Sequence, residues 1–306
     1  MGTPDFAVGT LEAMIQAGHD VAAVVTKVDK PVGRRMELKP SPVKKCAMDH
    51  GIPVLQPEKV RGNQAFLDEL RAIAPDVIVV AAYGKIIPSD ILTLPRYGCL
   101  NVHASLLPKY RGAAPIQWAV INGEEESGVT IMQMNEGLDT GDMIARVEIP
   151  LASDETGGSL FDKLAAAGAE LLTETLEKVE AGTAVPVPQP AESPTPYARM
   201  IKKEDGRIDW TKSAVQIERL VRGMNPWPSA FSILQGKNIR IWKSVTAPSA
   251  ASAAPGTVLA ADGEGIVVQT GSGALCIQEL QMEGRKRMKT EDFLRGHSMA
   301  PGERFC

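Results

Sequence analysis

Short, unbroken runs of small and β-branched apolar residues recur in the first half of the chain. The clearest are VAAVVT at residues 21–26 and DVIVVAAYG at residues 76–84. Because these runs show no polar alternation, they predict parallel strands that are buried on both faces of a sheet. Residues 6–18 and 63–74 carry apolar side chains at helical spacing, so helices are expected between the strands. This alternation predicts an open, mostly parallel α/β sheet that binds ligands at the carboxyl ends of its strands.

The segment MGTPDF at residues 1–6 looks like the first strand-to-helix turn of such a sheet, yet no strand-like run precedes it. We therefore expect the native chain to begin several residues upstream. In the sequence as given, the sheet is expected to lack one central strand.

A proline-rich segment divides the chain. Residues 157–182 show a long helical pattern, and five prolines follow within residues 183–196. Because proline favours extended chain, this composition predicts a semi-rigid linker. We place the domain boundary there, with a first domain at residues 1–182, a linker at 183–200 and a second domain at 201–306.

The second domain has the pattern of short strands separated by glycine turns. A hairpin is expected with its turn at residues 236–238, and further strands follow in residues 256–280. Together these strands predict a small antiparallel β-barrel, which we expect to be OB-like.

Missing patterns exclude several function classes. The four cysteines form no CxxC pair and the four histidines lack metal-ligand spacing, so no metal site is expected. Neither a GxGxxG turn, nor a GxxxxGK[ST] loop, nor a GxSxG elbow occurs. No run approaches the roughly 20 apolar residues that span a bilayer. We expect a monomer that works in the reducing cytoplasm and has no membrane partner.

Charge is unevenly distributed along the chain. The net charge is −4, but residues 197–306 carry 16 basic against 11 acidic side chains. Residues 26–45 carry seven basic against two acidic side chains. Such asymmetry can attract a polyanion even when the total charge is negative, although a solvated basic face is the simpler interpretation of either cluster alone.

Asn101 and His103 are two apart at the end of the strand-like run GCLNV. Residues at this spacing point to the same side of a strand, so both side chains can enter one site. The Asn amide can donate to a developing oxyanion, and the His ring is a base near neutral pH. The alternative is a structural histidine in the core.

Asp139 lies between Gly137 and Gly141, in a loop after another strand-like run. Aspartate and glycine are also the residues of an ordinary turn. If the two loops converge, Asn101, His103 and Asp139 form an acyl-transfer site without a covalent nucleophile. Ser105 follows His103 by two residues, and we interpret it as a loop hydrogen-bonder.

Six motifs together resemble one family over essentially the full length of the chain. They are GTPDFA, KPSPVK, AYGKIIP, NVHASLLPKYRGAAPIQWAVINGE, GVTIMQMNEGLDTGDM and NPWPSA. The resemblance is to the folate-dependent formyltransferases, in particular to those that act on methionyl-tRNA. It implies a Rossmann-like catalytic domain and transfer of the formyl group of 10-formyltetrahydrofolate to the α-amino group of charged initiator methionyl-tRNA. The runner-up is another enzyme of the family, either a 10-formyltetrahydrofolate hydrolase or a sugar N-formyltransferase. A third possibility is an inactive RNA-binding protein on the same scaffold.

The resemblance also implies site residues. The family's catalytic residues fall on Asn101, His103 and Asp139. Its folate-binding segment falls on Ser105, Leu106, Leu107 and Pro108, and the pterin is expected in an apolar pocket near Ile86, Ile87 and Leu138. Its tRNA-binding insertion falls on residues 29–45, where the functional arginine matches Arg34. The basic residues expected at tRNA are Arg34, Arg35, Lys39, Lys44, Lys45, Arg285, Lys286 and Arg287. No metal is required, because the folate carries an activated formyl group.

Overall fold

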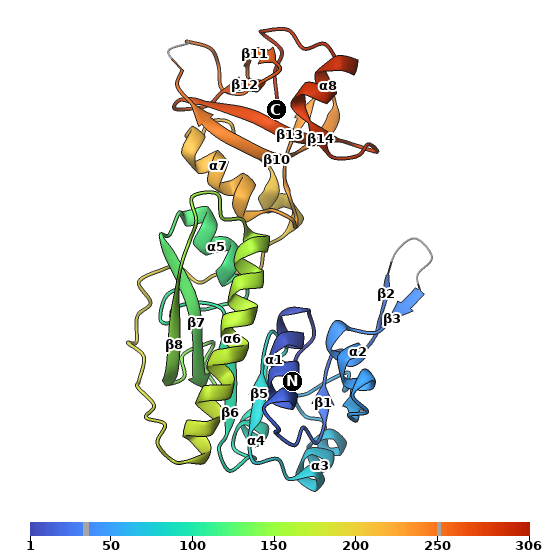
Figure 1. Ribbon diagram of the computed structural model, residues 1–306, viewed down its shortest axis with the longest axis vertical. Helices are drawn as coiled ribbons and strands as arrows, with labels where there is room; N and C mark the ends of the chain where they lie inside the picture. The colour runs from blue at the N-terminus through green and yellow to red at the C-terminus, as the bar shows by residue number, and fades with distance from the viewer. Residues whose placement is uncertain (33–36, 250–251) are drawn as a thin grey trace. The chain divides into compact units, whose positions relative to one another are not determined.

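The computed structural model describes residues 1–32, 37–249 and 252–306 (Figure 1). The chain divides into two compact units. Unit 1 comprises Met1–Pro115, Glu126–Pro150 and Phe161–Arg199. Unit 2 comprises Ile116–Glu125, Leu151–Leu160 and Met200–Cys306. Within the described ranges, none of the helices has the length and apolar character needed to cross a bilayer.

Unit 1 contains short strands alternating with helices. Its strands are β1 (Val24–Val25), β2 (Lys30–Val32), β3 (Glu37–Lys39), β4 (Val54–Leu55), β5 (Ile78–Val80), β6 (Cys99–His103), β7 (Glu126–Gln133) and β8 (Met143–Pro150). Its helices are α1 (Phe6–Gln16), α2 (Pro42–Asp49), α3 (Gln64–Ile73), α4 (Ser89–Leu92) and most of α6 (Gly157–Glu180).

The α/β alternation predicted from the sequence is confirmed. β1 pairs in parallel with β4, and β5 pairs in parallel with β6. β7 and β8 then extend the sheet in antiparallel fashion, in the order β5-β6-β7-β8. Because β7 runs against β6, Gln133 near its end pairs with Leu100 near the start of β6. The loop after β7 therefore begins beside the amino end of β6, whereas His103 lies at the carboxyl end of β6.

Met1 and Gly2 bridge the two parts of the sheet. The Gly2 N–H donates to the Val25 carbonyl at 3.0 Å, and the Ala81 N–H donates to the Met1 carbonyl at 2.9 Å. These two residues lie between β1 and β5. A cavity of about 510 Å³ borders α1, β1 and β5, and no candidate site residue lines it.

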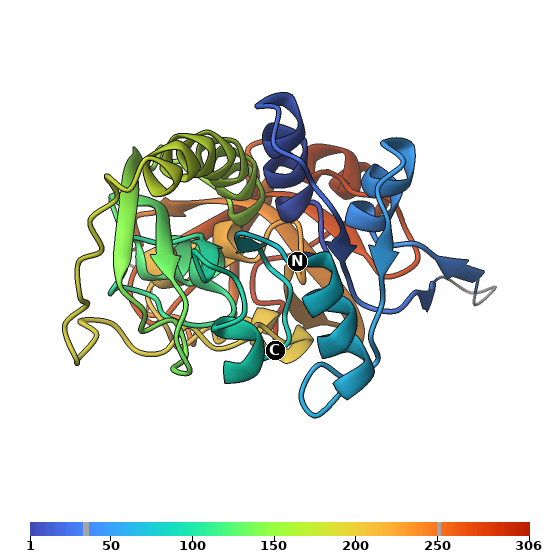
Figure 2. The same cartoon turned by 90° about the horizontal axis from the view of Figure 1, so that it is seen from below.

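Helix α6 packs on one face of β6 and β7 (Figures 1 and 2). A Cβ atom added to Gly168 would lie 3.0 Å from Val102 Cγ1 and 3.3 Å from Val129 Cγ1, so helix and sheet approach closely. Side chains alternate along a strand, so Asn101 and His103 lie on the face opposite to Val102 and α6. A buried cluster joins β1, β5 and Cys99 to α3 and α4 through Val25, Phe66, Leu70, Val80, Tyr83 and Ile91.

The basic hairpin β2–β3 is anchored at its base, where its two strands join the rest of unit 1. Lys44 Nζ lies 2.7 Å from Asp29 Oδ2 and donates to Gln56 Oε1 at 2.8 Å. Gln56 Nε2 donates to Asp29 Oδ1 and to the Lys27 carbonyl, both at 2.8 Å. Asp29 precedes β2 and Lys44 follows β3, so this network joins the two ends of the hairpin segment. The hydrogen bonds from Lys44 and Gln56 lower the pKa of Asp29 below its ordinary value.

Unit 2 is built on an antiparallel sheet in the order β11-β12-β13-β10-β9, and β14 pairs with β13. Its strands are β9 (Ala230–Leu234), β10 (Lys237–Ala247), β11 (Val258–Asp262), β12 (Gly265–Gln269), β13 (Ala274–Met282) and β14 (Met288–Lys289). Its helices are most of α5 (Pro115–Asn122), the 3₁₀ turn η1 (Lys203–Gly206), α7 (Ala214–Gly223) and α8 (Thr290–Gly296).

The hairpin β9–β10 is confirmed, but its turn lies at Gln235 and Gly236, one residue earlier than expected. Both residues have positive φ, 49° and 75°. Two successive residues of this kind form the two-residue turn whose twist matches a hairpin. Lys237 and Asn238 pair with Leu234 and Ile233, so they already belong to β10.

Residues 304–305 join the two edges of this sheet. Phe305 pairs with Leu234 at the end of β9, and Arg304 pairs with Thr257 next to β11. The Cys306 N–H also donates to the Ile233 carbonyl at 2.9 Å. These pairings close the antiparallel sheet into the small barrel that the strand pattern predicts.

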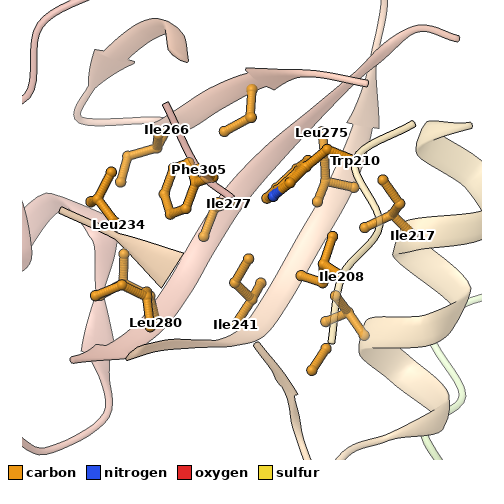
Figure 3. Close-up of a cluster of buried hydrophobic side chains, with 14 of the residues drawn as sticks. Ile208, Trp210, Ile217, Leu234, Ile241, Ile266, Leu275, Ile277, Leu280 and Phe305 are labelled. Atoms are coloured by element: carbon orange, nitrogen blue, oxygen red, sulfur yellow. The ribbon is translucent and has the colours of Figure 1, made fainter. Parts of the chain in front are cut away.

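Phe305 and Trp210 lie at the centre of the unit 2 core (Figure 3). Their ring centroids are 5.5 Å apart, and Trp210 Nε1 donates to Ser232 Oγ at 2.9 Å. Phe305 is 1% exposed. Phe305 therefore has two roles: its side chain fills the core, and its backbone pairs with the edge of the sheet.

Replacing Phe305 with Ala should therefore lower the free energy of unfolding by about 3–5 kcal/mol, the usual range for a buried Phe-to-Ala change. Urea unfolding followed by tryptophan fluorescence measures this loss. Val215→Ala, at a half-exposed position on α7, is the matched control and should change stability little. A loss for Phe305→Ala no larger than for the control would contradict its place in the core.

The Asp29 anchor should show a defined dependence on pH. Because the folded-state pKa of Asp29 is lowered, its stabilising effect is present above the ordinary value of 3.8 and is lost as pH falls through the folded pKa. Asp29→Asn should therefore be less stable than the parent at pH 7, with the difference vanishing in strong acid. Thermal unfolding of both proteins across pH 2.5–7 measures the difference. An equal gap at every pH would show that the carboxylate charge is not involved.

Candidate active site

Asn101 and His103 lie at the carboxyl end of β6, the strand between parallel β5 and antiparallel β7. Asn101 pairs with Val80 of β5, and His103 pairs with Thr130 of β7. The His103 side chain is 6% exposed, whereas Asn101 is half-buried. The expected position of both residues on one face at a strand end is confirmed.

A single hydrogen bond fixes the proton on the His103 ring. Nε2 lies 3.0 Å from the Tyr110 carbonyl oxygen. A carbonyl can only accept, so Nε2 carries the hydrogen and donates it. In the neutral ring, Nδ1 then has the free lone pair. Nδ1 faces Asp139, with 3.9 Å between Nδ1 and Asp139 Oδ1. A proton taken up at Nδ1 would meet a carboxylate.

Asp139 reaches His103 because its loop folds back along β6. The loop leaves β7 beside Cys99, where the Met134 N–H donates to the Cys99 carbonyl at 2.8 Å. Asp139 has a φ of 54°, in the left-handed region. Its Oδ2 accepts from the Gly112 N–H at 2.9 Å, which leaves Oδ1 towards His103. The expected convergence of the two loops is therefore found, through a fold-back rather than through two parallel strand ends.

The glycines of this loop make room for its own backbone. A Cβ atom on Gly141 would overlap the Gln133 carbonyl oxygen, and one on Gly137 would overlap Thr140 Oγ1. Asn135 Oδ1 accepts from the Gly137 N–H at 2.9 Å and from Thr140 Oγ1 at 3.0 Å. These glycines therefore allow the tight turn that carries Asp139.

The Asn101 amide makes no hydrogen bond within the described part of the chain. It is half-buried on the same face as His103 and Asp139. An unpaired amide N–H at the edge of a site is suited to donate to a substrate oxygen. The arrangement thus offers an amide donor, a ring nitrogen with a free lone pair, and a carboxylate that can stabilise the protonated ring.

Residues 105–108 form a packed turn after β6. Ser105 Oγ donates to the Lys109 carbonyl at 2.7 Å, as expected for a loop hydrogen-bonder. Thr130 Oγ1 donates to the Ser105 carbonyl at 2.7 Å and accepts from the Leu107 N–H at 3.1 Å. The Ser105 and Leu107 side chains are buried, whereas Leu106 and Pro108 are half-buried and able to contact a ligand.

The three apolar residues expected at the pterin differ in exposure. Ile86 is 70% exposed and Leu138 is 60% exposed, so both offer free apolar surface. Ile87 is 5% exposed and packs in the core cluster with Tyr83 and Ile91. The structure therefore gives the Ile87 side chain a place in the core.

The basic residues expected at tRNA also separate into groups. Arg34 and Arg35 lie outside the described residues. Lys39, Lys45, Arg285 and Lys286 are exposed, whereas Lys44 is paired with Asp29. Arg287 pairs with Glu279 at 2.5 Å and lies over the Trp242 ring, 5.1 Å from its centroid.

Sequence reasoning missed Arg111, which follows Tyr110 directly. Arg111 is buried, and its guanidinium donates to Gln189 Oε1 at 3.0 Å and to the Ala191 and Pro190 carbonyls at 3.1 and 2.7 Å. These partners lie 78–80 residues away in the sequence and two are backbone carbonyls, so no local pattern could indicate them. Across the described ranges, no three His, Cys, Asp or Glu side chains gather as they would around a metal ion.

Two sequence families match the chain in succession. Formyl transferase matches residues 1–176, and the formyl transferase C-terminal domain matches residues 200–298. The methionyl-tRNA formyltransferase of Agathobacter rectalis is 56% identical over 305 residues, which cover 100% of this chain and 98% of that protein. The methionyl-tRNA formyltransferase of Geobacter metallireducens is 51% identical over 305 residues, with 100% and 97% covered.

Solved structures of lower identity share the fold. The N-formyltransferase from Helicobacter canadensis, in complex with folinic acid and dTDP-3-aminofucose, has a TM-score of 0.66 at 20% identity and covers 94% of this chain and 97% of its own. HypX from Aquifex aeolicus, in complex with tetrahydrofolic acid, has a TM-score of 0.58 at 23% identity and covers 81% of this chain and 44% of its own.

The two family matches together cover most of the chain. Relatives that are more than 50% identical align with its whole length. The chain belongs to the methionyl-tRNA formyltransferases, within the formyl transferase family.

Proposed function

We propose that the chain transfers the formyl group of 10-formyltetrahydrofolate to the α-amino group of charged initiator methionyl-tRNA. The observation that carries this proposal is the grouping at the end of β6. There the lone pair of His103 Nδ1 faces Asp139 at 3.9 Å, on the face that also bears the Asn101 amide. The full-length relatives named for this reaction support it.

Asn101 is assigned to the formyl oxygen. 10-Formyltetrahydrofolate supplies an activated formyl carbon, so no metal is required to polarise it. As the amine adds to that carbon, the carbonyl oxygen gains negative charge, and the Asn101 N–H donates to it. One such donor typically stabilises the transition state by ~3–4 kcal/mol.

His103 is assigned to the proton. An α-amino group titrates near pH 7.7–8.0, so a useful fraction of it is neutral at pH 7. When the amine nitrogen bonds to the formyl carbon, its surplus proton passes to His103 Nδ1. The ring becomes an imidazolium beside the Asp139 carboxylate, which stabilises it. His103 then returns the proton to the departing folate nitrogen as its bond to the formyl carbon breaks.

The folate and tRNA sites complete the proposal. Ser105, Leu106, Leu107 and Pro108 form the folate-binding turn, and the exposed Ile86 and Leu138 offer apolar surface to the pterin. Arg34, Arg35, Lys39, Lys45, Arg285, Lys286 and Arg287 are assigned to tRNA. Lys44 is assigned to the anchor of the basic hairpin, because its ammonium is paired with Asp29.

We further propose residues 1–182 as the catalytic domain, 183–200 as the linker and 201–306 as a tRNA-binding domain. The basic side chains of residues 197–306 favour contacts with tRNA phosphates that do not depend on sequence. We expect the chain to work as a monomer in the cytoplasm, where translation supplies charged tRNA.

Substitution of Asn101, His103 or Asp139 should lower kcat and leave the KM values for both substrates nearly unchanged. His103→Ala should lose about 10²–10⁴-fold in kcat, and Asn101→Ala about 10²–10³-fold. Asp139→Asn should lose more than about 10²-fold, because it no longer stabilises the imidazolium. Initial rates with 10-formyltetrahydrofolate and charged methionyl-tRNA measure these losses, and free methionine tests the need for tRNA.

The same assay separates the alternatives. Loss of 10-formyltetrahydrofolate to water at a rate indifferent to tRNA would indicate a hydrolase. Formylation of an amino sugar in preference to methionyl-tRNA would indicate a sugar N-formyltransferase. Binding of tRNA without any turnover of folate would indicate an inactive RNA-binding protein.

Arg34 and Arg35, in the basic segment at residues 29–45, should contribute to the binding of tRNA and not to the binding of folate. Arg34→Ala with Arg35→Ala should raise the KM for methionyl-tRNA and leave the KM for folate unchanged. It should also flatten the salt dependence of tRNA binding by about one in log–log slope for each phosphate that the two arginines neutralise. Filter binding across salt concentrations measures this slope. Arg61→Ala with Arg71→Ala removes the same charge from exposed positions outside the loop and is the matched control. An equal effect of the two pairs would attribute the change to net charge.

A further inference from the structure

The proline-rich segment lies against the two loops of the candidate site, the loop after β6 and the loop after β7 that carries Asp139. We call residues 187–198 the strap. At one end, Val187 and Met143 exchange two backbone hydrogen bonds of 2.8 Å. At the other end, the Ala198 N–H donates to the Arg111 carbonyl at 2.8 Å, and the Ala114 N–H donates to the Ala198 carbonyl at 3.0 Å. The whole strap belongs to unit 1.

Gln189 contacts the loop that carries Asp139. Its Nε2 donates to the Asp139 carbonyl at 3.0 Å and to the Gly141 carbonyl at 2.7 Å. Its Oε1 accepts from Arg111 Nε at 3.0 Å. The amide nitrogen thus donates two bonds to the Asp139 loop, and the amide oxygen accepts one bond from Arg111.

Arg111 fixes the backbone of the strap beside Gln189. Its Nη1 donates to the Ala191 carbonyl at 3.1 Å, and its Nη2 donates to the Pro190 carbonyl at 2.7 Å. The Arg111 side chain is buried, so these bonds also satisfy a cation that burial would otherwise destabilise. Arg111 comes from the loop after β6, and it therefore connects that loop to the strap.

Thr195 contacts the loop that orients His103. Its Oγ1 accepts from the Tyr110 N–H at 2.7 Å. The carbonyl of the same residue, Tyr110, accepts from His103 Nε2 at 3.0 Å. Two residues earlier in the strap, Ser193 Oγ donates to the Pro108 carbonyl at 2.7 Å. The strap thus bonds to the backbone on both sides of the His103 partner.

We propose that the strap is a positioning element of the active site, with Gln189 and Thr195 as positioning residues for the His103–Asp139 pair. The inference rests on the catalytic roles proposed above for these two residues. The Asp139 loop folds back from the far end of β6, and Asp139 has a left-handed φ of 54° that costs free energy in a non-glycine residue. Gln189 binds the two carbonyls of this loop at Asp139 and Gly141, and so stabilises the fold-back.

The most direct test replaces the two N–H donors of Gln189 with a carboxylate oxygen, which can only accept. Gln189→Glu keeps an oxygen for Arg111 but presents a second carboxylate oxygen, in place of N–H groups, to the Asp139 and Gly141 carbonyls. We expect kcat to fall about tenfold to a hundredfold, the scale of a misplaced catalytic group, while both KM values change less than about twofold. The thermal midpoint should stay close to that of the parent, because the new carboxylate pairs with Arg111. Glu192→Gln, an exposed position on the strap, is the matched control and should match the parent.

Two further variants test how the effect is transmitted. Thr195→Val removes the acceptor for the Tyr110 N–H at nearly constant shape and should also lower kcat. If Gln189 acts through Asp139, adding Gln189→Glu to Asp139→Asn should cause almost no further loss, because residues that act as a unit are not additive.

The outcomes separate the two levels of the proposal. Loss of kcat in Asp139→Asn but parent activity in Gln189→Glu would overturn the strap inference alone. Independent, multiplicative losses in the double variant would overturn it as well, since Gln189 would then act elsewhere. Parent activity in Asp139→Asn would overturn the catalytic assignment and the inference together.

Discussion

The hydrogen bond from His103 Nε2 to the Tyr110 carbonyl is the contact on which the proposed chemistry of the site depends. It assigns the ring proton to one nitrogen and presents the lone pair of the other to Asp139. Had Nε2 faced a carboxylate instead, the free lone pair would point into the packed turn after β6. In the proposed reaction, the direction of proton transfer is therefore set by backbone geometry seven residues further along the chain, where Tyr110 has a φ of 57°.

Asp139 is positioned by equally indirect means. The Gly112 N–H binds one carboxylate oxygen and leaves the other for His103. A Cβ atom on Gly112 would lie 2.6 Å from the Ala198 carbonyl, so glycine is required for the strap to approach at that point. The arrangement of His103 and Asp139 thus depends on close backbone contacts that larger residues would prevent. Both loops are backed by the buried sheet of unit 1, which supplies rigidity that loops alone lack.

The sequence was sufficient to predict what depends on local pattern. The apolar runs predicted β1 and β5, and the spacing of Asn101 and His103 predicted their shared face. What depends on tertiary contacts was not predictable. Lys44 looked like one more lysine of a basic loop, yet Asp29, fifteen residues earlier, pairs with it. Ile86 and Ile87 are identical residue types in succession, and only tertiary packing decides that Ile87 is buried and Ile86 is exposed. The antiparallel direction of β7, which forces the Asp139 loop to fold back, leaves no local signal in a run of apolar residues.

The proline-rich segment shows how one composition supports two interpretations. Alternating prolines at 186, 188 and 190 favour extended chain, which predicts a linker. The same alternation lowers the conformational entropy of the unfolded segment, so ordering it along a surface costs less than ordering a flexible chain. Proline has no N–H, so the donors come from the intervening residues. The Val187 N–H bonds to Met143 at the start of β8, and the Gln189 side chain bonds to the Asp139 loop, while the Pro190 carbonyl is left for Arg111. A segment that forms no helix or strand of its own keeps its polar groups available, and so it is well suited to bind the loops after β6 and β7.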